Sequence, residues 1–531
     1  MPAKHPRRIQ VYDTSLRDGA QGEDVSFSAN DKIAIAKRLD AFGIDFIEGG
    51  WPGSNPKDID FFRLIRQEKL VHAKIAAFGS TRHAKHKPED DPNLREMIAS
   101  EAPVVTIFGK SWLLHVKEAL RVEAKTNLEM VADSIAFCRS HKRDVIFDAE
   151  HFFDGYKDES AYALEVLGAA ADAGASCLVL CDTNGGCLPH EVREIVTEVC
   201  RKFPKTAIGF HGHNDAACAV ANTFVAVAAG AVHVQGTING IGERCGNTDL
   251  TAILPGLMLK MGLATNVTLD QLTDLSRFVD ELANIAPNKR QPYTGASAFA
   301  HKAGIHVSAM QRNDRTYEHI RPDTVGNHRR VLVSELSGQS NVLFKAREMG
   351  IAVEEKSSAL KNVLQEIKQR EHKGYEYEAA DASFELLIRR ALGQFEPSFE
   401  ILGFRVIDEV RNGAVVSEAT VKVRVLGKEE HTAAEGDGPV HALDVALRKA
   451  LRPFFPALEQ IELIDYKVRV LTAKGLEGTA SKVRVLVEST DGSAIWSTVG
   501  VSTNIIEASY EALADSIEYK LMKDHHKNKG S

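Results

Sequence analysis

The sequence lacks the features of membrane and exported proteins. Its 531 residues contain no apolar run long enough to span a bilayer, and no hydrophobic signal segment stands at the start. The seven cysteines include no C-x-x-C pair, so neither a structural zinc site nor a disulfide framework is expected. Together these absences predict a cytoplasmic protein whose thiols are reduced.

A strongly basic surface is also missing. The formal net charge is -8, so we expect no electrostatic attraction to nucleic acid or to an anionic membrane. The hydrophobic fraction of 44% is that of ordinary globular proteins. A chain of this length is expected to form two or three domains, each with its own core.

From residue 9 to about residue 262 the sequence predicts alternating strands and helices. Short apolar runs are each followed by polar or Gly-rich residues and then by a segment of helical periodicity. Alternation of this kind predicts a parallel sheet, and eight units predict a (β/α)8 TIM barrel. An open doubly wound sheet is the alternative, but no G-x-G-x-x-G follows the first run. The predicted strands are 9–16, 45–51, 74–78, 104–108, 144–148, 177–181, 207–211 and 233–238.

The ends of these predicted strands are rich in ionisable and amide groups. In a (β/α)8 barrel the catalytic side chains lie just past the C-terminal ends of the strands. We therefore expect an active site at one rim of the barrel. The segments concerned are 16–21, 148–151, 181–186, 211–215 and 242–247.

His211 and His213 are the sharpest signal among them. Residues i and i+2 of a strand face the same side, so both imidazoles should face the barrel mouth. Two neutral imidazoles in this arrangement chelate a divalent transition metal. The alternative is a pair of hydrogen-bonded histidines at a strand end.

Asp18 and Asn247 are expected beside these histidines, because strand one closes against strand eight. The four residues would form an N2O2 ligand set with two open octahedral positions. A 2-oxo acid can fill both positions with its carboxylate and its carbonyl oxygen. Asn247 is the weakest member, since Asn before a helix is often only an N-cap.

The remaining rim residues fit the chemistry of carbon–carbon bond formation. Arg17 would steady an oxygen that becomes an alkoxide; its alternative is a salt bridge with Glu243 or Glu150. Glu150 shares a strand face with Asp148, so either is a candidate for the functional carboxylate.

Two further rim residues are candidates for binding the substrate. Thr183 offers a hydroxyl to a substrate carboxylate, with an ST-turn as the alternative role. Gln21 ends the segment that follows the first strand.

These motifs together resemble those of the 2-isopropylmalate synthase family, which includes homocitrate and citramalate synthases. Four segments in the correct order carry the resemblance, which covers nearly the whole chain. Within the family, residues 49–58 (GGWPGSNPKD) resemble the bacterial citramalate synthase branch. The four segments are 13–21 (DTSLRDGAQ), 211–215 (HGHND), 242–247 (GERCGN) and 299–306 (FAHKAGIH).

The resemblance implies a homodimeric acyltransferase of isoleucine biosynthesis. It would condense acetyl-CoA with pyruvate and water to give (R)-citramalate and CoA. It implies that Arg17, Gln21 and Thr183 contact the oxo acid and that Glu150 belongs to the catalytic centre. The divalent metal (Mn, Mg or Zn) would be held by Asp18, His211, His213 and Asn247.

The resemblance also implies that a His and a Tyr beyond the barrel reach the active site, often that of the partner subunit. His306 and Tyr317 are the candidates. The chain departs from the family directly after His306, where Val307 and Ser308 stand in place of the Gln-Asp of many members. The contact made by that acidic side chain is therefore not expected here.

Three other functions remain open from the sequence. A 2-isopropylmalate synthase would use 3-methyl-2-oxobutanoate in place of pyruvate. A metal-dependent lyase or aldolase on the same barrel would share the Arg-Asp and His-x-His pattern. A non-catalytic amino-acid sensor would keep the C-terminal region but would not need the metal ligands.

Beyond the barrel (1–275) we expect a linker (276–378) that contributes to the active site, with helices at 342–349 and 359–371. From 379 to 531 the pattern of strands followed by a helix occurs twice, which indicates an internal duplication. The helices of the two copies are expected at 439–451 and 505–522.

The loop formed by Gly436, Asp437 and Gly438 leads into the first of these helices. The N-terminus of a helix attracts a carboxylate, and the resemblance implies a regulatory domain that senses isoleucine. The alternative is a tight turn with Pro439 at the first helical position and no ligand.

Overall fold

The computed structural model describes residues 7–302, 304–332, 339–353, 358–471 and 481–529. The chain forms two compact units, Met1–Phe299 with Ile320–His328, and Ala300–His319 with Arg329–Ser531. None of the helices in the described ranges combines the length and the apolar character that a membrane span requires.

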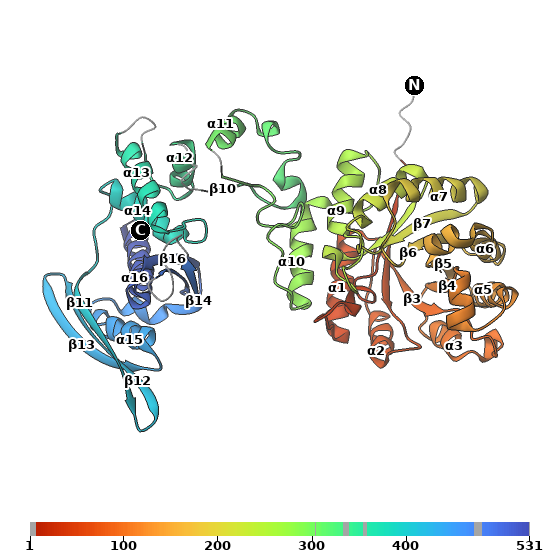
Figure 1. Cartoon of the computed structure of the whole chain (residues 1–531), viewed down its shortest axis with the longest axis horizontal. Helices are drawn as coiled ribbons and strands as arrows, with labels where there is room; N and C mark the ends of the chain where they lie inside the picture. Colours follow the sequence, from red (N-terminus) through yellow and green to blue (C-terminus); the bar gives the residue numbers. More distant parts are fainter. Residues whose placement is uncertain (1–6, 303, 333–338, 354–357, 472–480, 530–531) are drawn as a thin grey trace. The chain divides into compact units, whose positions relative to one another are not determined.

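The first unit is a closed barrel of eight parallel strands (Figure 1). The strands follow one another in sequence order, and β8 closes the barrel by pairing with β1. This confirms the predicted (β/α)8 barrel. All eight predicted runs are strands, although the first ends at Asp13 and not at residue 16. The strands are β1 (Gln10–Asp13), β2 (Phe46–Gly50), β3 (Lys74–Ser80), β4 (Val104–Lys110), β5 (Asp144–Glu150), β6 (Cys177–Asp182), β7 (Ala207–Gly212) and β8 (His233–Gly236).

Helices of the first unit connect these strands. Helix α1 begins at a capping box, in which the Ser28 hydroxyl accepts from the Asp31 N–H, and ends at Gly43 with φ 99°. Helix α7 opens with Pro189 at its first position. The helices are α1 (Ala29–Phe42), α2 (Pro56–Ile65), α3 (Pro92–Ala99), α4 (Leu113–His115), α5 (Ala124–Ser140), α6 (Phe152–Asp172), α7 (Pro189–Lys202), α8 (Ala219–Ala229), α9 (Leu250–Pro255) and α10 (Leu272–Leu282).

The interior of the barrel follows the two-residue period of its strands. On β6, Cys177 and Cys181 lie in the inner core, whereas Leu178 and Leu180 pack in the layer between strands and helices. Burial raises the pKa of both thiols well above the usual value. All seven cysteines lie in the described ranges, and none forms a disulfide.

The same alternation brings polar side chains into the barrel. Glu48 on β2, Asp148 on β5, His211 on β7 and Gln235 on β8 are all buried. Glu48 and Asp148 stand two residues after the inner-core residues Phe46 and Ile146. His211 lies opposite Cys181 and Gln235 lies opposite Tyr12 on the neighbouring strands. The barrel therefore carries a polar layer inside an otherwise apolar core.

The second unit contains the predicted duplication. Two three-stranded antiparallel sheets are each followed by a helix. In the first copy, Ala442 and Leu443 of the helix pack in one core with Val421 and Val423 of the central strand. The first copy is β11 (Glu400–Arg411), β12 (Ala414–Val425), β13 (Lys428–Gly436) and α15 (Pro439–Leu451), and the second is β14 (Glu462–Leu471), β15 (Lys482–Thr490), β16 (Ile495–Ser502) and α16 (Ile505–Lys529).

Short elements precede these sheets. The helices predicted at 342–349 and 359–371 are present as α12 (Gln339–Glu348) and α13 (Ser358–Lys373). The other elements are β9 (Ala300–His301), α11 (Gly304–Arg312), β10 (Arg330–Val331) and α14 (Asp381–Ala391).

Candidate metal centre and active site

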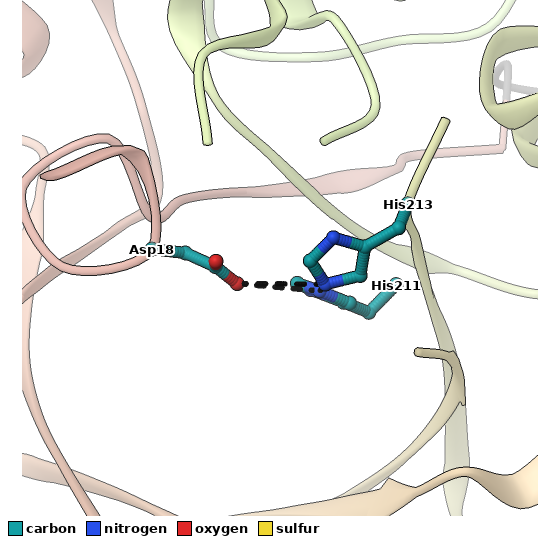
Figure 2. A group of neighbouring side chains, drawn as sticks. All are labelled: Asp18, His211 and His213. Carbon is teal, nitrogen blue, oxygen red and sulfur yellow. Dashed lines mark hydrogen bonds and ion pairs between the residues drawn. The ribbon is translucent and has the colours of Figure 1, made fainter. Parts of the chain in front are cut away.

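Asp18, His211 and His213 converge at the barrel mouth (Figure 2). The Nε2 atoms of the two histidines lie 3.3 Å apart. They lie 3.5 Å and 3.9 Å from Oδ2 of Asp18. Ligand atoms about 2.1 Å from one cation are themselves about 3.0–3.4 Å apart, so a small contraction of this group would enclose a divalent metal. The three residues fit the predicted site.

The charges of this group also suit a cation. Burial lowers the pKa of His211, and burial followed by the nearby His211 lowers the pKa of His213 to about 4. Both imidazoles are therefore neutral near pH 7 and have a lone pair to share. Burial alone would raise the pKa of Asp18, but Arg17 and then the two histidines lower it below its usual value.

Asn247 is brought to the same place. Its backbone forms a bridge with His213, and its side chain is 2% exposed. The amide nitrogen donates to the carbonyl oxygen of Ile241 at 3.2 Å, whereas Oδ1 has no hydrogen-bond partner within the described part of the chain. The alternative role of N-cap is excluded, because the residue that caps α9 is Asp249. Oδ1 of Asn247 is therefore a candidate for the fourth metal ligand.

Arg17 is anchored by Glu48. Its Nε lies 2.5 Å from Oε1 of Glu48, and the guanidinium lies 3.7 Å from the centre of the Phe78 ring. Burial alone would lower the pKa of Arg17, but Glu48 and Asp18 raise it above its usual value. The alternative salt bridge of Arg17 with Glu243 or Glu150 was wrong. Glu48 is nearer because β2 neighbours β1 in the barrel.

A cavity of about 230 Å³ joins these groups. Its aromatic wall is formed by Trp51, Phe78 and Phe108. The two Phe rings stack with centroids 5.1 Å apart, and the Trp51 ring lies nearly perpendicular to both, with centroid distances of 5.9 and 5.4 Å. The cavity therefore has a charged side that can bind an anionic substrate and a rigid apolar side. The rim residues that line it are Arg17, Asp18, Gln21, Asp148, Glu150, Thr183, His211, His213, Glu243 and Arg244.

Glu150 and Thr183 each have a partner at the cavity. Glu150 forms an ion pair with Lys110 at the end of β4. The Thr183 hydroxyl accepts a hydrogen bond from the His151 N–H at 2.9 Å. His151 has φ 54°, an uncommon conformation for a residue other than glycine. The hydroxyl of Thr183 can still donate to a substrate, because this bond uses only its acceptor side.

His306 and Tyr317 lie together in the second unit. Their rings stack with centroids 4.0 Å apart, so the two residues expected beyond the barrel form one group. Tyr317 is 44% exposed, so a large part of this residue is accessible.

The loop Gly436–Gly438 joins β13 to α15. Gly438 precedes the helix and Pro439 is its first residue. The Asp437 N–H donates to Nδ1 of His441 at 3.1 Å. A Cβ at Gly436 would lie 2.4 Å from the nitrogen of Ala442, so the loop requires glycine there.

Sequence reasoning missed three residues that contact the site residues. Glu48 pairs with Arg17, Lys110 pairs with Glu150, and Oε1 of Gln235 lies 2.9 Å from Nδ1 of His211. Glu48 and Gln235 lie inside runs that were assigned to strands 45–51 and 233–238. A polar residue at an inward position of an apolar strand is the signal that would have found them.

Three family models match the chain. The model described as HMGL-like matches residues 8–279, which contain the barrel. The homocitrate synthase post-HMGL domain-like model matches residues 293–374. The LeuA allosteric (dimerisation) domain model matches residues 378–521, which contain the duplicated sheets.

The chain is similar over nearly its whole length to several citramalate and isopropylmalate synthases. It is 57% identical to the (R)-citramalate synthase of Geobacter sulfurreducens, with 97% of this chain and 98% of that protein aligned. It is 52% identical to the (R)-citramalate synthase of Aquifex aeolicus, with 97% and 98% aligned. It is 30% identical to the 2-isopropylmalate synthase of Methanocaldococcus jannaschii, with 98% and 96% aligned. The chain therefore belongs to the HMGL-like family and, within it, to the group of the (R)-citramalate synthases.

Proposed function

We propose that this protein is an acyltransferase that condenses acetyl-CoA with pyruvate and water, giving (R)-citramalate and CoA. The observation that carries the proposal is the meeting of Asp18, His211 and His213 with Arg17 in one cavity. The 57% sequence identity to an (R)-citramalate synthase also supports the proposal. The acceptor of the acyl unit is a 2-oxo acid, whose carboxylate and ketone suit a cationic site.

In this proposal Asp18, His211, His213 and Asn247 would hold a divalent cation, and that cation would supply Lewis-acid polarisation to the ketone of the oxo acid. Arg17 directs its remaining N–H groups to the oxygen that becomes negative as the new bond forms. The anchor on Glu48 keeps the guanidinium in one orientation. Gln21 and Thr183 bind the carboxylate of the oxo acid from the rim.

The proton chemistry is assigned to Glu150, His306 and Tyr317. A thioester methyl group is weakly acidic, so a positioned base must remove one proton before the carbon attacks the ketone. Water then cleaves the thioester, and the thiolate of CoA takes up a proton. The stacking of His306 on Tyr317 supports their action as a pair. We propose that this pair acts at a barrel rim, either that of its own subunit or that of the partner subunit in a homodimer.

A second cavity offers room for the acyl-CoA. It measures about 370 Å³ and shares Phe108 with the first cavity. Lys110, Arg82 and two histidines line it, and such groups suit an anionic cosubstrate. The Lys110–Glu150 ion pair connects the lining of this cavity to Glu150, which supports a thioester bound near that carboxylate.

Pyruvate is favoured over 3-methyl-2-oxobutanoate by the aromatic wall. The stacked rings of Phe78 and Phe108 leave little freedom for repacking around a branched side chain. The cavity of about 230 Å³ must hold the cation, the oxo acid and the incoming acyl group.

The C-terminal region is proposed to regulate and dimerise the enzyme. Its match to the LeuA allosteric (dimerisation) domain supports this. We propose isoleucine as the effector and the loop Gly436, Asp437 and Gly438 as a contact for its carboxylate. In this division residues 1–275 form the catalytic domain, 276–378 the linker and 379–531 the regulatory domain.

Release of free thiol from acetyl-CoA tests the function. We expect release with pyruvate in the presence of Mn²⁺, Mg²⁺ or Zn²⁺, and none after chelation. Faster release with 3-methyl-2-oxobutanoate would instead identify a 2-isopropylmalate synthase. If no acid releases thiol but a hydroxyacyl-CoA is cleaved, the protein is a lyase. Isoleucine added to the same assay tests the regulation.

A further inference from the structure

The two nitrogens of the His211 ring face different surroundings. Nε2 faces Asp18 and His213 at the candidate metal centre. Nδ1 faces away from it and lies 2.9 Å from Oε1 of Gln235. The two residues are direct neighbours across β7 and β8, so the backbone register brings the amide to the ring.

The Gln235 amide is itself held from its other end. Its Nε2 lies 3.1 Å from Oδ1 of Asp148, which reaches it from β5. Gln235 is 1% exposed and Asp148 is 4% exposed, so water does not compete for these bonds. The chain of contacts is Asp148, Gln235, His211 and then the metal centre.

The order of donors along this chain follows from elementary chemistry. An amide nitrogen only donates and an amide oxygen only accepts. In the structure Nε2 of Gln235 donates to the Asp148 carboxylate, and the amide oxygen faces His211. Nδ1 of His211 must then carry the hydrogen, which leaves the lone pair on Nε2 directed at Asp18 and His213. A neutral imidazole binds a metal through the nitrogen that carries no hydrogen.

We propose that Gln235 and Asp148 are positioning residues that hold His211 in the Nδ1–H form, with Nε2 free to bind a cation. The inference rests on the metal set proposed above and does not depend on the identity of the oxo acid. It applies to His211 only. Nδ1 of His213 is buried and has no hydrogen-bond partner among the described residues, so His213 has no comparable support.

Metal affinity is the direct test. The Gln235→Leu variant keeps the size of the side chain but removes both hydrogen bonds. We expect its affinity for Zn²⁺, measured on the full chain by competition with a chromophoric chelator, to fall about 10–100-fold. Thr106→Val is the matched control. It removes a bond to the Tyr12 hydroxyl inside the same barrel, a bond that includes none of the candidate metal ligands, and should leave the affinity unchanged.

A double variant that exchanges the amide and the carboxylate tests whether the hydrogen bonds or the packing of these side chains matter. In the double variant Asp148→Asn with Gln235→Glu, the new amide donates to the new carboxylate, which again accepts from Nδ1–H. We expect this variant to recover most of the affinity that Gln235→Leu loses. Nitrogen NMR of the histidines in the metal-free wild type should find the hydrogen on Nδ1 of His211.

Two outcomes would overturn the inference alone: wild-type affinity in Gln235→Leu, or the hydrogen on Nε2 of metal-free His211. Absence of Zn²⁺ binding by the wild type would overturn the metal set, and with it this role of Gln235. If the wild type binds Zn²⁺ but forms no citramalate, only the proposed function is contradicted.

Discussion

The Nε atom of Arg17 lies 2.5 Å from Oε1 of Glu48, a carboxylate whose side chain is completely buried. Glu48 also accepts hydrogen bonds from the hydroxyls of Thr14 and Tyr12. It does not line the cavity, whereas Arg17 does. The orientation of a group that faces the substrate is thus determined by a carboxylate beneath it, on the next strand of the barrel.

Replacement of Glu48 by Gln should damage both stability and substrate binding. The change leaves the buried guanidinium without its main counter-charge, which costs about 3–5 kcal/mol. We expect a lower free energy of unfolding in urea and a raised KM for pyruvate. The control is Arg8→Gln, which breaks the half-exposed ion pair with Asp45 and should cost less than about 1 kcal/mol. Equal effects of the two variants would show that the Arg17–Glu48 pair has no special role.

Asn247→Ala tests the fourth metal ligand. Loss of a ligand oxygen should weaken Mn²⁺ or Zn²⁺ binding at least about tenfold, as measured by chelator competition. Asn214→Ala is the control, because its side chain accepts a hydrogen bond from the Ala219 N–H near the same loops. Wild-type metal affinity in Asn247→Ala would remove this residue from the ligand set.

Phe108→Ala should change the choice of oxo acid. Removing the ring opens the aromatic wall, and each methylene-sized difference in such a pocket corresponds to about 1–3 kcal/mol. We expect kcat/KM for 2-oxobutanoate relative to pyruvate to rise about tenfold or more. Phe108→Leu should give a smaller shift in the same direction. An unchanged ratio in both variants would mean that specificity is set elsewhere.

Mixed dimers test whether His306 and Tyr317 serve a partner subunit. Asp18→Asn and His306→Ala should each be inactive alone. If the two groups meet across a symmetric dimer, unfolding and refolding the variants together should restore about a quarter of the wild-type activity. No recovery, although hetero-dimers are detected by mass, would assign the pair to its own barrel.

We expect the free energy of unfolding of the barrel to depend on pH because of Asp13. Burial raises the pKa of Asp13 to about 7, above its unfolded value of about 3.9. The folded state therefore binds more protons in this range, and stability is lost as the pH rises from about 4 to about 7. We expect Asp13→Asn to gain free energy of unfolding relative to the wild type over that window, with no further change above it.

Asp40 provides the opposite case for comparison. Burial alone would raise its pKa, but hydrogen bonds from the Ala73, Val71 and His72 N–H groups lower it. Its stabilisation is present above the unfolded pKa and is lost as the pH falls below it. Asp40→Asn should therefore cost stability at neutral pH and less in acid. If urea unfolding gave the same pH dependence for both variants, burial of Asp13 would not be the cause.

Local patterns in the sequence were enough to predict the barrel and most of its rim. Strands and helices follow from periods of two and 3.6 residues, which are properties of neighbouring residues along the chain. Strand ends in a barrel share one rim, so the rule for the C-terminal ends predicted that Asp18, His211 and His213 would meet. The structure brings these three together.

The pairing of side chains inside the barrel was decided only by the tertiary structure. Glu48 beneath Arg17, and Asp148 with Gln235 behind His211, join strands that are distant in sequence. Such contacts depend on strand register and on the height of each residue in the closed barrel. No local period encodes those quantities, because they are properties of the assembled strands and not of neighbouring residues along the chain.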